Sequence, residues 1–321
     1  MTTLSIICAF RDARHFLPTL LGSLDRARLE DWELILVDDS SRDYPRKVID
    51  GFADRWGNVQ LVRLDESRGP ASARNRGMER STGEFLAFVD ADDWVGPNYF
   101  ADMLQTMRRT GADFGRTNQT RVTGTERVIH CPDDFRYDIA LDPRSAILPN
   151  DRSTMVDFPY SHSGIFHRRL LDRGLLPMPE GLWTAEDRPW IWSLHLFADS
   201  YVRIPTNEYF YRRGVSSSLT QIGDERQLDF IPSFTQVLEL LLGDPDLSIY
   251  LPKASRQTLA VVNHHLAEIK RLEPGLRARM LEQLPGLVAM IPAEHLSEQL
   301  RSLGVRRADR LRRYLPELHE L

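Results

Sequence analysis

The acidic segment that follows the apolar run 85–89 carries the clearest chemistry in the sequence. This run leads directly into Asp90, Asp92 and Asp93. Along an extended backbone, Asp90 and Asp92 lie on one side and Ala91 on the other. Paired carboxylates hold hard divalent cations such as Mn²⁺ or Mg²⁺, and such a cation can neutralise the charge of a departing diphosphate. The alternative is a solvated turn in which Asp93 caps the following helix.

Two further clusters are candidates to contact an anionic ligand. Asp39 ends a second apolar run and can accept hydrogen bonds from a base ring or a ribose, although capping of the next helix is a competing interpretation. The segment 67–77 opens a helix with Gly, Pro and small residues, which lets a phosphate approach the helix N-terminus. Arg68 and Arg74 are candidates to pair with that phosphate, unless they are surface arginines of an amphipathic helix.

These residues need a scaffold that brings strand ends together. The first hundred residues alternate strand-like apolar runs with segments of helical apolar spacing. Such alternation indicates crossover connections and a mainly parallel sheet flanked by helices, an α/β fold. In open sheets of this kind, ligands bind at the carboxyl edge of the strands. The predicted strands are 4–10, 33–37, 59–64 and 84–90, and the predicted helices are 15–28, 45–56 and 70–81.

The rest of the chain divides into two parts. Residues 111–185 indicate short strands and loops without clear boundaries, and a helix is predicted over 188–198. From about Asp224 the apolar spacing becomes helical, which predicts an all-helical C-terminal region. Breaks in its helices are predicted near Pro245, Pro274, Pro285 and Pro292.

Composition argues against several classes of protein. The formal net charge of −5 argues against general nucleic-acid binding. No apolar run is long enough to span a bilayer, and no signal-peptide pattern is present. The two cysteines, Cys8 and Cys131, fit a reducing compartment, so we predict a cytoplasmic protein. A dinucleotide oxidoreductase is not expected, because no Gly-x-Gly-x-x-Gly follows a predicted strand.

The order and spacing of these segments resemble a known family. Residues 4–99 are similar to the donor-binding half of the inverting glycosyltransferase family 2, which has a GT-A fold. The combination of features is more specific than any single one. The matching segments are Asp38-Asp39-Ser40-Ser41, Gly69 with Ala73-Arg74-Asn75-Arg76-Gly77, Thr82-Gly83-Glu84, and Phe88-Val89-Asp90-Ala91-Asp92-Asp93.

The resemblance implies roles around a bound donor. It makes Asp92 the main ligand of a divalent cation and places Asp90 near both the ribose and the cation. It also places Asp39 at the base and Arg74 near the donor, and Ala91 is expected to touch the donor between the two metal-site aspartates.

The end of the first strand departs from the family pattern. Family members often carry Pro-x-Tyr-Asn there, and this chain has Ala9, Phe10, Arg11 and Asp12 instead. Ala9, Phe10 and Arg11 are expected to contact the donor, and the planar guanidinium of Arg11 is a candidate to stack on its base. A UDP-sugar is the predicted donor, although this departure weakens the assignment of the base.

The resemblance extends to about residue 220. Glu186 and Asp187 resemble the family's Glu-Asp motif, whose aspartate is the catalytic base, so Asp187 is expected to take the proton of an acceptor hydroxyl. The alternative is a simple N-terminal charge on a helix. The segment 211–218 resembles the one that often closes over the pyrophosphate, with a flexible surface turn as the competing interpretation. It implies donor contacts from Ser216, Ser217 and Ser218.

The predicted function is a metal-dependent, inverting transfer of a sugar from a nucleotide donor to an acceptor hydroxyl. The predicted domains are a GT-A catalytic domain over 1–223 and a helical region over 224–321. Within the first, residues 1–110 form the nucleotide-sugar-binding half and 111–223 the acceptor-side half. A nucleotidyltransferase of similar fold ranks second, because no glycine-rich loop follows the first strand. A non-catalytic nucleotide-sugar-binding protein is the third interpretation.

The helical region matches no feature of the family. Its apolar stripes fit packing on the catalytic domain or on another copy of the chain in a homo-oligomer. Arginines recur three and four residues apart near the C-terminus, so one helix face is predicted to be basic. Such a face fits an anionic acceptor polymer or peripheral contact with anionic lipid, with a solvated surface helix as the alternative. The arginines are Arg306, Arg307, Arg310 and Arg313.

Overall fold

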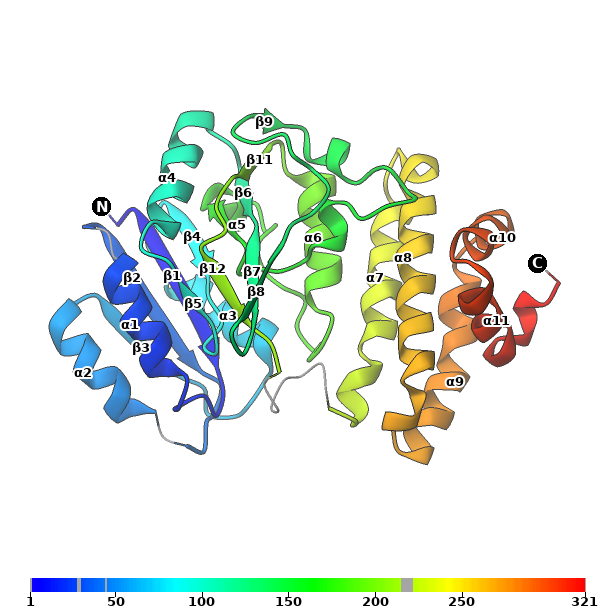
Figure 1. The fold of residues 1–321 in the computed structure, drawn as a ribbon, viewed down its shortest axis with the longest axis horizontal. Coiled ribbons are helices and arrows are strands. Elements are labelled where there is room, and N and C mark those ends of the chain that lie inside the picture. Colours follow the sequence, from blue (N-terminus) through cyan, green and yellow to red (C-terminus); the bar gives the residue numbers. More distant parts are fainter. Residues whose placement is uncertain (1, 28–29, 44, 215–221, 321) are drawn as a thin grey trace.

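A central sheet organises the first two thirds of the chain. The computed structural model describes residues 2–27, 30–43, 45–214 and 222–320. Within these ranges, eight strands form one sheet in the order β3-β2-β1-β4-β10-β6-β11-β9 (Figure 1). Its strands are β1 (Leu4–Phe10), β2 (Trp32–Asp38), β3 (Val59–Arg63), β4 (Phe85–Phe88), β6 (Phe114–Thr117), β9 (Ala140–Leu141), β10 (Gly164–His167) and β11 (Tyr201–Ile204).

The sheet is parallel on the side that carries the predicted ligand edge. Strands β3, β2, β1 and β4 run parallel, as do β6 and β11. Strand β10 is antiparallel to both of its neighbours, and β9 is antiparallel to β11. Helices cover both faces, so the predicted mainly parallel α/β architecture is confirmed. The helices of this part are α1 (Leu17–Ala27), α2 (Arg46–Trp56), α3 (Pro70–Arg80), α4 (Tyr99–Thr110), α5 (Arg169–Asp172) and α6 (Asp187–Phe197).

Alternation along β1 divides the core into two layers. Ile7 belongs to the cluster beneath α3, whereas Ile6 and Cys8 belong to the cluster that includes α1 and α4. Successive side chains of a strand point to opposite faces, so a fully apolar strand contributes to both layers. Helix α3 begins with Pro70 at its first position, where no backbone N–H is needed.

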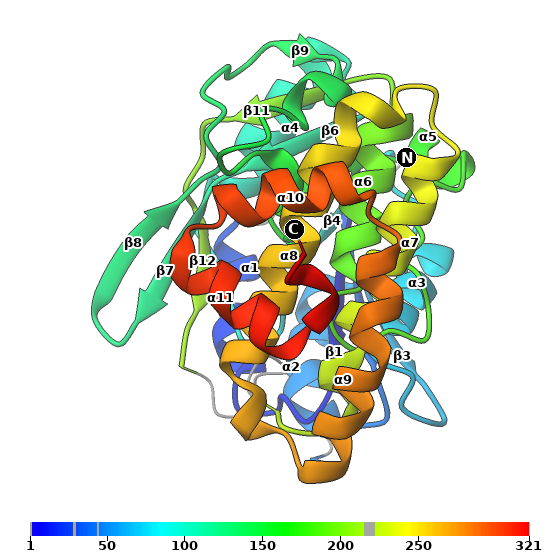
Figure 2. The ribbon, with the colours of Figure 1, turned by 90° about the vertical axis from the view of Figure 1, so that its right-hand side faces the viewer.

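A smaller sheet lies beside the large one. Its order is β5-β12-β7-β8, and the β7–β8 hairpin projects from the body of the protein (Figure 2). The strands are β5 (Trp94–Val95), β7 (Gln119–Thr123), β8 (Glu126–His130) and β12 (Tyr209–Arg212), and 3-10 turns lie at Pro143–Ala146 (η1) and Met155–Asp157 (η2).

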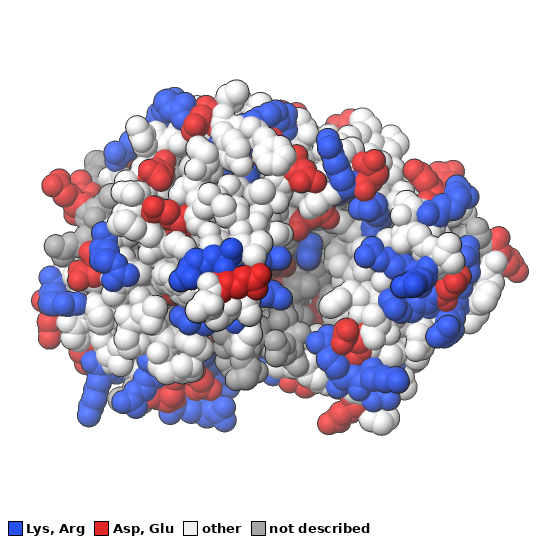
Figure 3. Space-filling view, viewed as in Figure 1, with Lys and Arg blue, Asp and Glu red and all other residues white. Residues whose placement is uncertain are grey.

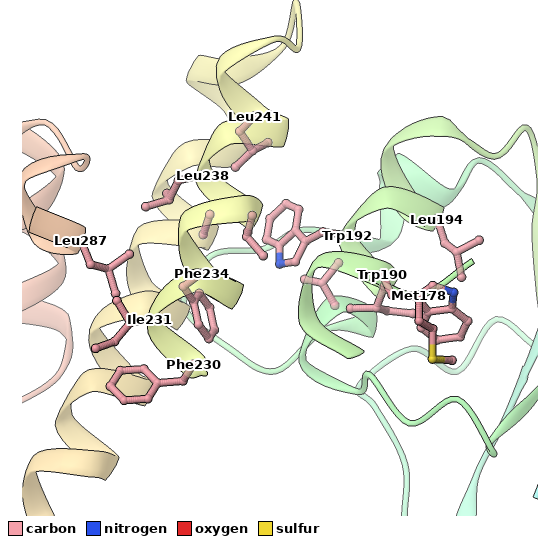
Figure 4. Packing of buried hydrophobic residues seen from close by; sticks show 14 of the residues in the cluster. Met178, Trp190, Trp192, Leu194, Phe230, Ile231, Phe234, Leu238, Leu241 and Leu287 are labelled. Atoms are coloured by element: carbon pink, nitrogen blue, oxygen red, sulfur yellow. The ribbon is translucent and has the colours of Figure 1, made fainter. Parts of the chain in front are cut away.

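The C-terminal third is helical, as the apolar spacing predicts. Helix α7 packs on α6, where Trp192 points toward α7 (Figure 4). The C-terminal helices and one face of the sheet share a single hydrophobic cluster. The elements are α7 (Phe230–Leu242), α8 (Leu247–Ala267), α9 (Pro274–Ala289), α10 (Ala293–Ser302), α11 (Val305–Tyr314), and the 3-10 turns η4 (Glu225–Leu228), η5 (Ile269–Arg271) and η6 (Pro316–Leu318).

Two ion pairs also join the C-terminal helical region to the rest of the chain. Arg144 lies 2.6 Å from Asp244, and the buried Lys253 of α8 lies 2.5 Å from Asp157 of η2. The predicted helix break at Pro285 is wrong, because this residue lies inside α9. The proline removes one backbone hydrogen bond, and the buried Leu284 and Leu287 on either side of it pack the helix against its neighbours.

Among the described helices, none combines the length and apolar character that crossing a bilayer requires.

Candidate active site

Asp90 lies at the carboxyl end of β4 and is held from two directions. Arg74 of α3 donates from Nη2 to Asp90 Oδ1 at 3.0 Å. His162, two residues before β10, places Nδ1 2.9 Å from Asp90 Oδ2. These contacts hold the pKa of the Asp90 carboxyl well below its usual range against the opposing effect of burial, chiefly through the charge of Arg74. Asp90 is therefore an oriented, ionised group.

Asp93 has a supporting role in the geometry. Its buried carboxylate accepts hydrogen bonds from the Tyr209 hydroxyl at 2.9 Å and from the Arg212 backbone N–H at 2.7 Å. Burial, followed by the charges of Asp92 and Asp90, raises the pKa of Asp93 well above its usual value. The Tyr209 ring also stacks on His162 at 4.3 Å between ring centroids, so Asp93 ties β12 to the acidic strand end.

Asp92 differs from both neighbours because its carboxylate is open. It is half-buried, and no hydrogen bond from another residue of the described ranges reaches its carboxylate oxygens. Its carbonyl oxygen accepts a hydrogen bond from Arg212 Nε at 2.6 Å, which fixes the backbone. Burial and the nearby charge of Asp90 raise the pKa of the Asp92 carboxyl. A cation bound here would remove this penalty, because it supplies the missing positive charge.

The donor atoms of this cluster fit a divalent cation. Ligand atoms of Asp90, Asp93 and His162 lie within 4.8 Å of one another, whereas Asp92, the predicted main ligand, is not part of this group. Oxygen ligands suit Mg²⁺, and a mixed oxygen and imidazole set suits Mn²⁺ as well. Asp92 differs from these side chains by its open carboxylate, and its place as main ligand stays a prediction.

Glu186 and Asp187 lie at the start of α6 and join the same network. Arg74 donates from Nη1 to Glu186 Oε1 at 2.9 Å, so one guanidinium bridges Glu186 and Asp90. Burial and the charge of Asp187 raise the pKa of Glu186 to about 7. Burial likewise raises the pKa of Asp187, while the charge of Arg188 opposes that rise. A carboxylate of raised pKa is a stronger base, which is what proton abstraction from a hydroxyl requires.

Asp39 organises the loop that leads into α3. Its carboxylate accepts from the Arg68 backbone N–H at 2.7 Å, the Gly69 N–H at 3.1 Å and the Ser67 hydroxyl at 2.6 Å. The Arg68 side chain turns away to pair with Glu66 at 2.8 Å. Asp39 is therefore a loop anchor in this structure, and the predicted base contact would use its remaining lone pairs.

The side chains at the end of β1 point in different directions, so they do not form one donor-contacting surface. Arg11 is exposed and donates to the Ser67 hydroxyl at 2.5 Å, which leaves its guanidinium beside the Asp39 loop. Ala9 packs at the edge of the cluster beneath α3. The Phe10 side chain and Ala91 are buried in the other layer, so a donor could meet them through their backbones. The predicted donor contacts Ser216, Ser217 and Ser218 lie outside the described residues.

The sequence did not reveal His162, Tyr209 or the bridging role of Arg74. His162 has no metal-like spacing to another histidine, and its partner Asp90 is 72 residues away in the chain. Its second ring nitrogen, Nε2, lies 2.8 Å from Gln119 Oε1. The position of His162 just before β10 points to the site only once β10 is known to pair with β4.

Comparison with known proteins decides the family. The model of Glycosyl transferase family 2 matches residues 5–176, more than half of the chain. The chain belongs to glycosyl transferase family 2. This family member is 26% identical over 238 residues to a PGL/p-HBAD biosynthesis glycosyltransferase of Mycobacterium tuberculosis, covering 73% of this chain and 85% of the relative. It is 25% identical over 226 residues to the uncharacterized glycosyltransferase EpsJ of Bacillus subtilis, covering 70% and 65%.

The family 2 chain spans between 56% and 65% of the length of three Bacillus subtilis relatives that it matches. Its fold is similar to the crystal structure of S. aureus TarS 1-349 in complex with UDP-GlcNAc, with a TM-score of 0.76 and 16% identity. That superposition covers 99% of this chain and 92% of the TarS chain. The predicted GT-A fold with an all-helical C-terminal region is therefore confirmed.

Proposed function

We propose that this chain transfers a sugar from a nucleoside-diphosphate sugar to an acceptor hydroxyl, with inversion at the anomeric carbon. The observation that carries the proposal is the Arg74 bridge, which joins Asp90 at the end of β4 to Glu186 at the start of α6. The bridge links the acidic cluster, a candidate metal site, to a candidate base. A sugar transfer needs both, because a hydroxyl attacks the anomeric carbon on one face while the diphosphate leaves that carbon from the opposite face.

The donor end of the proposed site is the acidic cluster. Asp92 and Asp90 would hold a Mn²⁺ or Mg²⁺ ion, and a bound cation neutralises the charge that grows on a leaving diphosphate. A UDP-sugar is the proposed donor. TarS was solved with UDP-GlcNAc, and a Pyrobaculum calidifontis mannosyltransferase of similar fold, with a TM-score of 0.54, was solved with GDP-Man and Mn²⁺.

The acceptor end of the proposed site is Asp187. As the hydroxyl attacks the anomeric carbon, Asp187 takes its proton, and the carbon–oxygen bond to the diphosphate breaks in the same displacement. The N-terminus of α6 supports the ionised carboxylate through the helix dipole. An anionic polymer is the proposed acceptor class. One relative, a teichoic acid poly(glycerol phosphate) polymerase of Staphylococcus epidermidis, is 35% identical over 111 residues, though these cover only 15% of its length.

A donor screen tests the reaction class. The protein is incubated with Mn²⁺ and a panel of nucleotide sugars, and the slow release of nucleoside diphosphate is measured. We expect one donor to be hydrolysed in a way that EDTA abolishes. If no nucleotide sugar is hydrolysed or bound, the proposal is wrong.

The Asp187→Asn variant tests the base. Because a base acts only in the transition state, its loss should lower kcat by roughly 10²–10⁴-fold while donor affinity stays near that of the parent. Asp54→Asn, at an exposed position of α2, is the matched control and should keep normal turnover. Turnover of Asp187→Asn close to the parent rate would reject this residue, and retention of anomeric configuration by NMR would reject the mechanism.

A further inference from the structure

The loop Trp183–Thr184–Ala185, just before the Glu186–Asp187 pair, is held by the C-terminal helical region. Asp229, at the start of α7, accepts hydrogen bonds on Oδ2 from the backbone N–H of Trp183 at 2.6 Å and of Thr184 at 3.2 Å. These are backbone groups of an irregular segment, and one carboxylate oxygen satisfies both of them.

The same helix fixes the last residue of the loop. Ser233, one turn into α7, donates from its hydroxyl to the Ala185 carbonyl at 2.7 Å. Ala185 has φ of +59°, in the left-handed region that residues with a side chain rarely adopt. A conformation of this kind persists when its surroundings hold it in place. The Ser233 hydrogen bond is one such restraint, and it acts on the peptide group that leads into Glu186.

The Trp183 side chain connects this loop to the donor side. A Cβ atom built on Gly69 would lie 3.2 Å from the Trp183 ring, so the indole lies directly against the N-terminal end of α3. The Arg226 guanidinium lies 5.6 Å from the centroid of the indole, and the Arg226 carbonyl accepts a hydrogen bond from the Thr184 hydroxyl at 2.7 Å. The loop is therefore held between the donor-binding helix and the segment that opens the C-terminal region.

We infer that Asp229 and Ser233 are positioning residues for the reaction, because they set the direction in which the chain enters α6 and presents Asp187. This inference rests on the proposed function. It gives the helical region a part in catalysis that does not involve contact with either substrate: α7 restrains the loop, the loop places Glu186 and Asp187, and Glu186 meets the Arg74 that also orients Asp90.

The test compares the two ends of α7. Asp229→Ala removes the acceptor for two loop N–H groups, whereas Asp229→Asn keeps an amide oxygen in the same place. Asp244→Ala is the matched control, since Asp244 lies just beyond the other end of α7 and also binds the catalytic part of the chain, through Arg144, without touching the loop. Ser233→Ala is compared with Thr235→Ala, whose hydroxyl donates to the Ile231 carbonyl within α7.

Two readouts separate positioning from stability. The first is hydrolysis of the donor that the nucleotide-sugar panel selects, together with binding of UDP and Mn²⁺. Asp229→Ala and Ser233→Ala should lower kcat by about 10–100-fold with little change in nucleotide affinity, because misplacement of a reacting group affects the transition state. Asp229→Asn should stay close to the parent, and both controls should keep their kcat even where their melting temperature falls.

The second readout is hydrogen exchange at the amides of 183–187 in the protein without ligands. Exchange there should accelerate in Asp229→Ala but not in Asp244→Ala, at temperatures where both are folded. Parent-like kcat in Asp229→Ala and Ser233→Ala, or equal losses in Asp229→Asn and Asp229→Ala, would overturn the inference. If Asp187→Asn is active, the proposed base fails, and the exchange data still decide whether α7 restrains the loop.

Discussion

Asp90 and Asp92 are two residues apart and meet opposite surroundings. Both oxygens of Asp90 already face a partner, Arg74 on one side and His162 on the other. Asp92 has raised basicity and open oxygens. A cation would therefore gain most from Asp92, because that carboxylate gives up no protein hydrogen bond when it binds a metal.

The Asp92→Ala variant tests this difference. We expect it to lose the Mn²⁺-dependent part of UDP binding, because the open carboxylate is removed, while the fold survives at a half-buried position. Titration calorimetry of the parent and the variant, each with Mn²⁺ and with EDTA, measures the effect. Asp65→Ala, a carboxylate on the loop after β3, is the control. Equal affinity for UDP in all four measurements would contradict the metal assignment.

Arg188 should set the pH range of the reaction. A base must be ionised, so kcat/KM should rise with pH and level off above the pKa of Asp187, which burial raises and the Arg188 charge lowers. Arg188→Gln removes a cation that favours the ionised form, so the pKa should rise further and the rising limb should move to higher pH. Arg173→Gln, which breaks a surface pair with Asp199, should leave the limb in place. A rising limb that moves to lower pH in Arg188→Gln would contradict this prediction.

For single residues, the sequence predicts which side chains belong to the site better than it predicts the hydrogen bonds between them. Asp90, Asp92 and Asp187 are predicted because a strand end and a family motif are local patterns. The bridge from Arg74 to Glu186 spans 112 residues of chain, and no local pattern encodes such a pair. Asp229 was not predicted for the same reason, because it can bind the loop before α6 only when the fold places α7 beside that loop.

Gly77 sets how closely α3 approaches the sheet, and α3 carries Arg74 and begins directly after Gly69. A Cβ atom at Gly77 would clash with the Ile7 side chain of β1. Gly77→Ala should therefore destabilise the protein by about 1–3 kcal/mol through overpacking, which outweighs a gain in helix propensity of about 1 kcal/mol. Gly286→Ala in α9 is the matched control, because nothing lies within 4 Å of the added Cβ.

Denaturant unfolding measures both variants. The control should be unchanged or more stable by up to about 1 kcal/mol. A stabilised Gly77→Ala variant would mean that α3 can shift away from β1, and donor binding should then change because Arg74 moves with it.

Most elements of the first hundred residues were predictable because apolar strands and amphipathic helices alternate there regularly, although β4 has only four residues and the two-residue β5 was not predicted. Strands β1 and β2 have seven residues each, and their helices carry clear apolar stripes. The region 111–185 was not, because its strands have between two and five residues. Strand β10 enters the middle of the sheet antiparallel to both neighbours, and short apolar runs do not state their direction.

At the scale of the whole molecule, the C-terminal helices carry a local group of basic side chains, although residues 225–321 hold 13 Lys and Arg and 13 Asp and Glu in total. Figure 3 shows Lys and Arg side chains grouped over this end, with a few acidic side chains among them. Of the four arginines predicted to share a basic face on α11, Arg310 donates to Asn263 of α8 and is half-buried. Arg306, Arg307 and Arg313 are exposed, and no ion pair involves them among the described residues.

Replacing Arg306, Arg307 and Arg313 with Gln tests whether this surface meets a polyanion. Donor hydrolysis should stay at the parent rate, because the site lies elsewhere. Binding to poly(glycerol phosphate), measured by co-sedimentation, should weaken mainly at low salt, where attraction between charges is least screened. If the variant binds poly(glycerol phosphate) as the parent does at every salt concentration, the arginines of α11 do not bind a polyanion and the helix is only structural.

The shared hydrophobic cluster has a consequence for how the protein is made. The face of α6 that bears Trp192 leaves the ribosome long before residues 230–318, which cover it. At about 5–20 residues per second, the covering helices follow after a delay on the order of ten seconds. Throughout that delay the nascent chain exposes the apolar face of α6 that bears Trp192, and the loop 183–185 lacks its hydrogen bonds to Asp229 and Ser233. Chaperone dependence during translation, and aggregation of prematurely terminated chains, should therefore concentrate in products that end between α6 and α9.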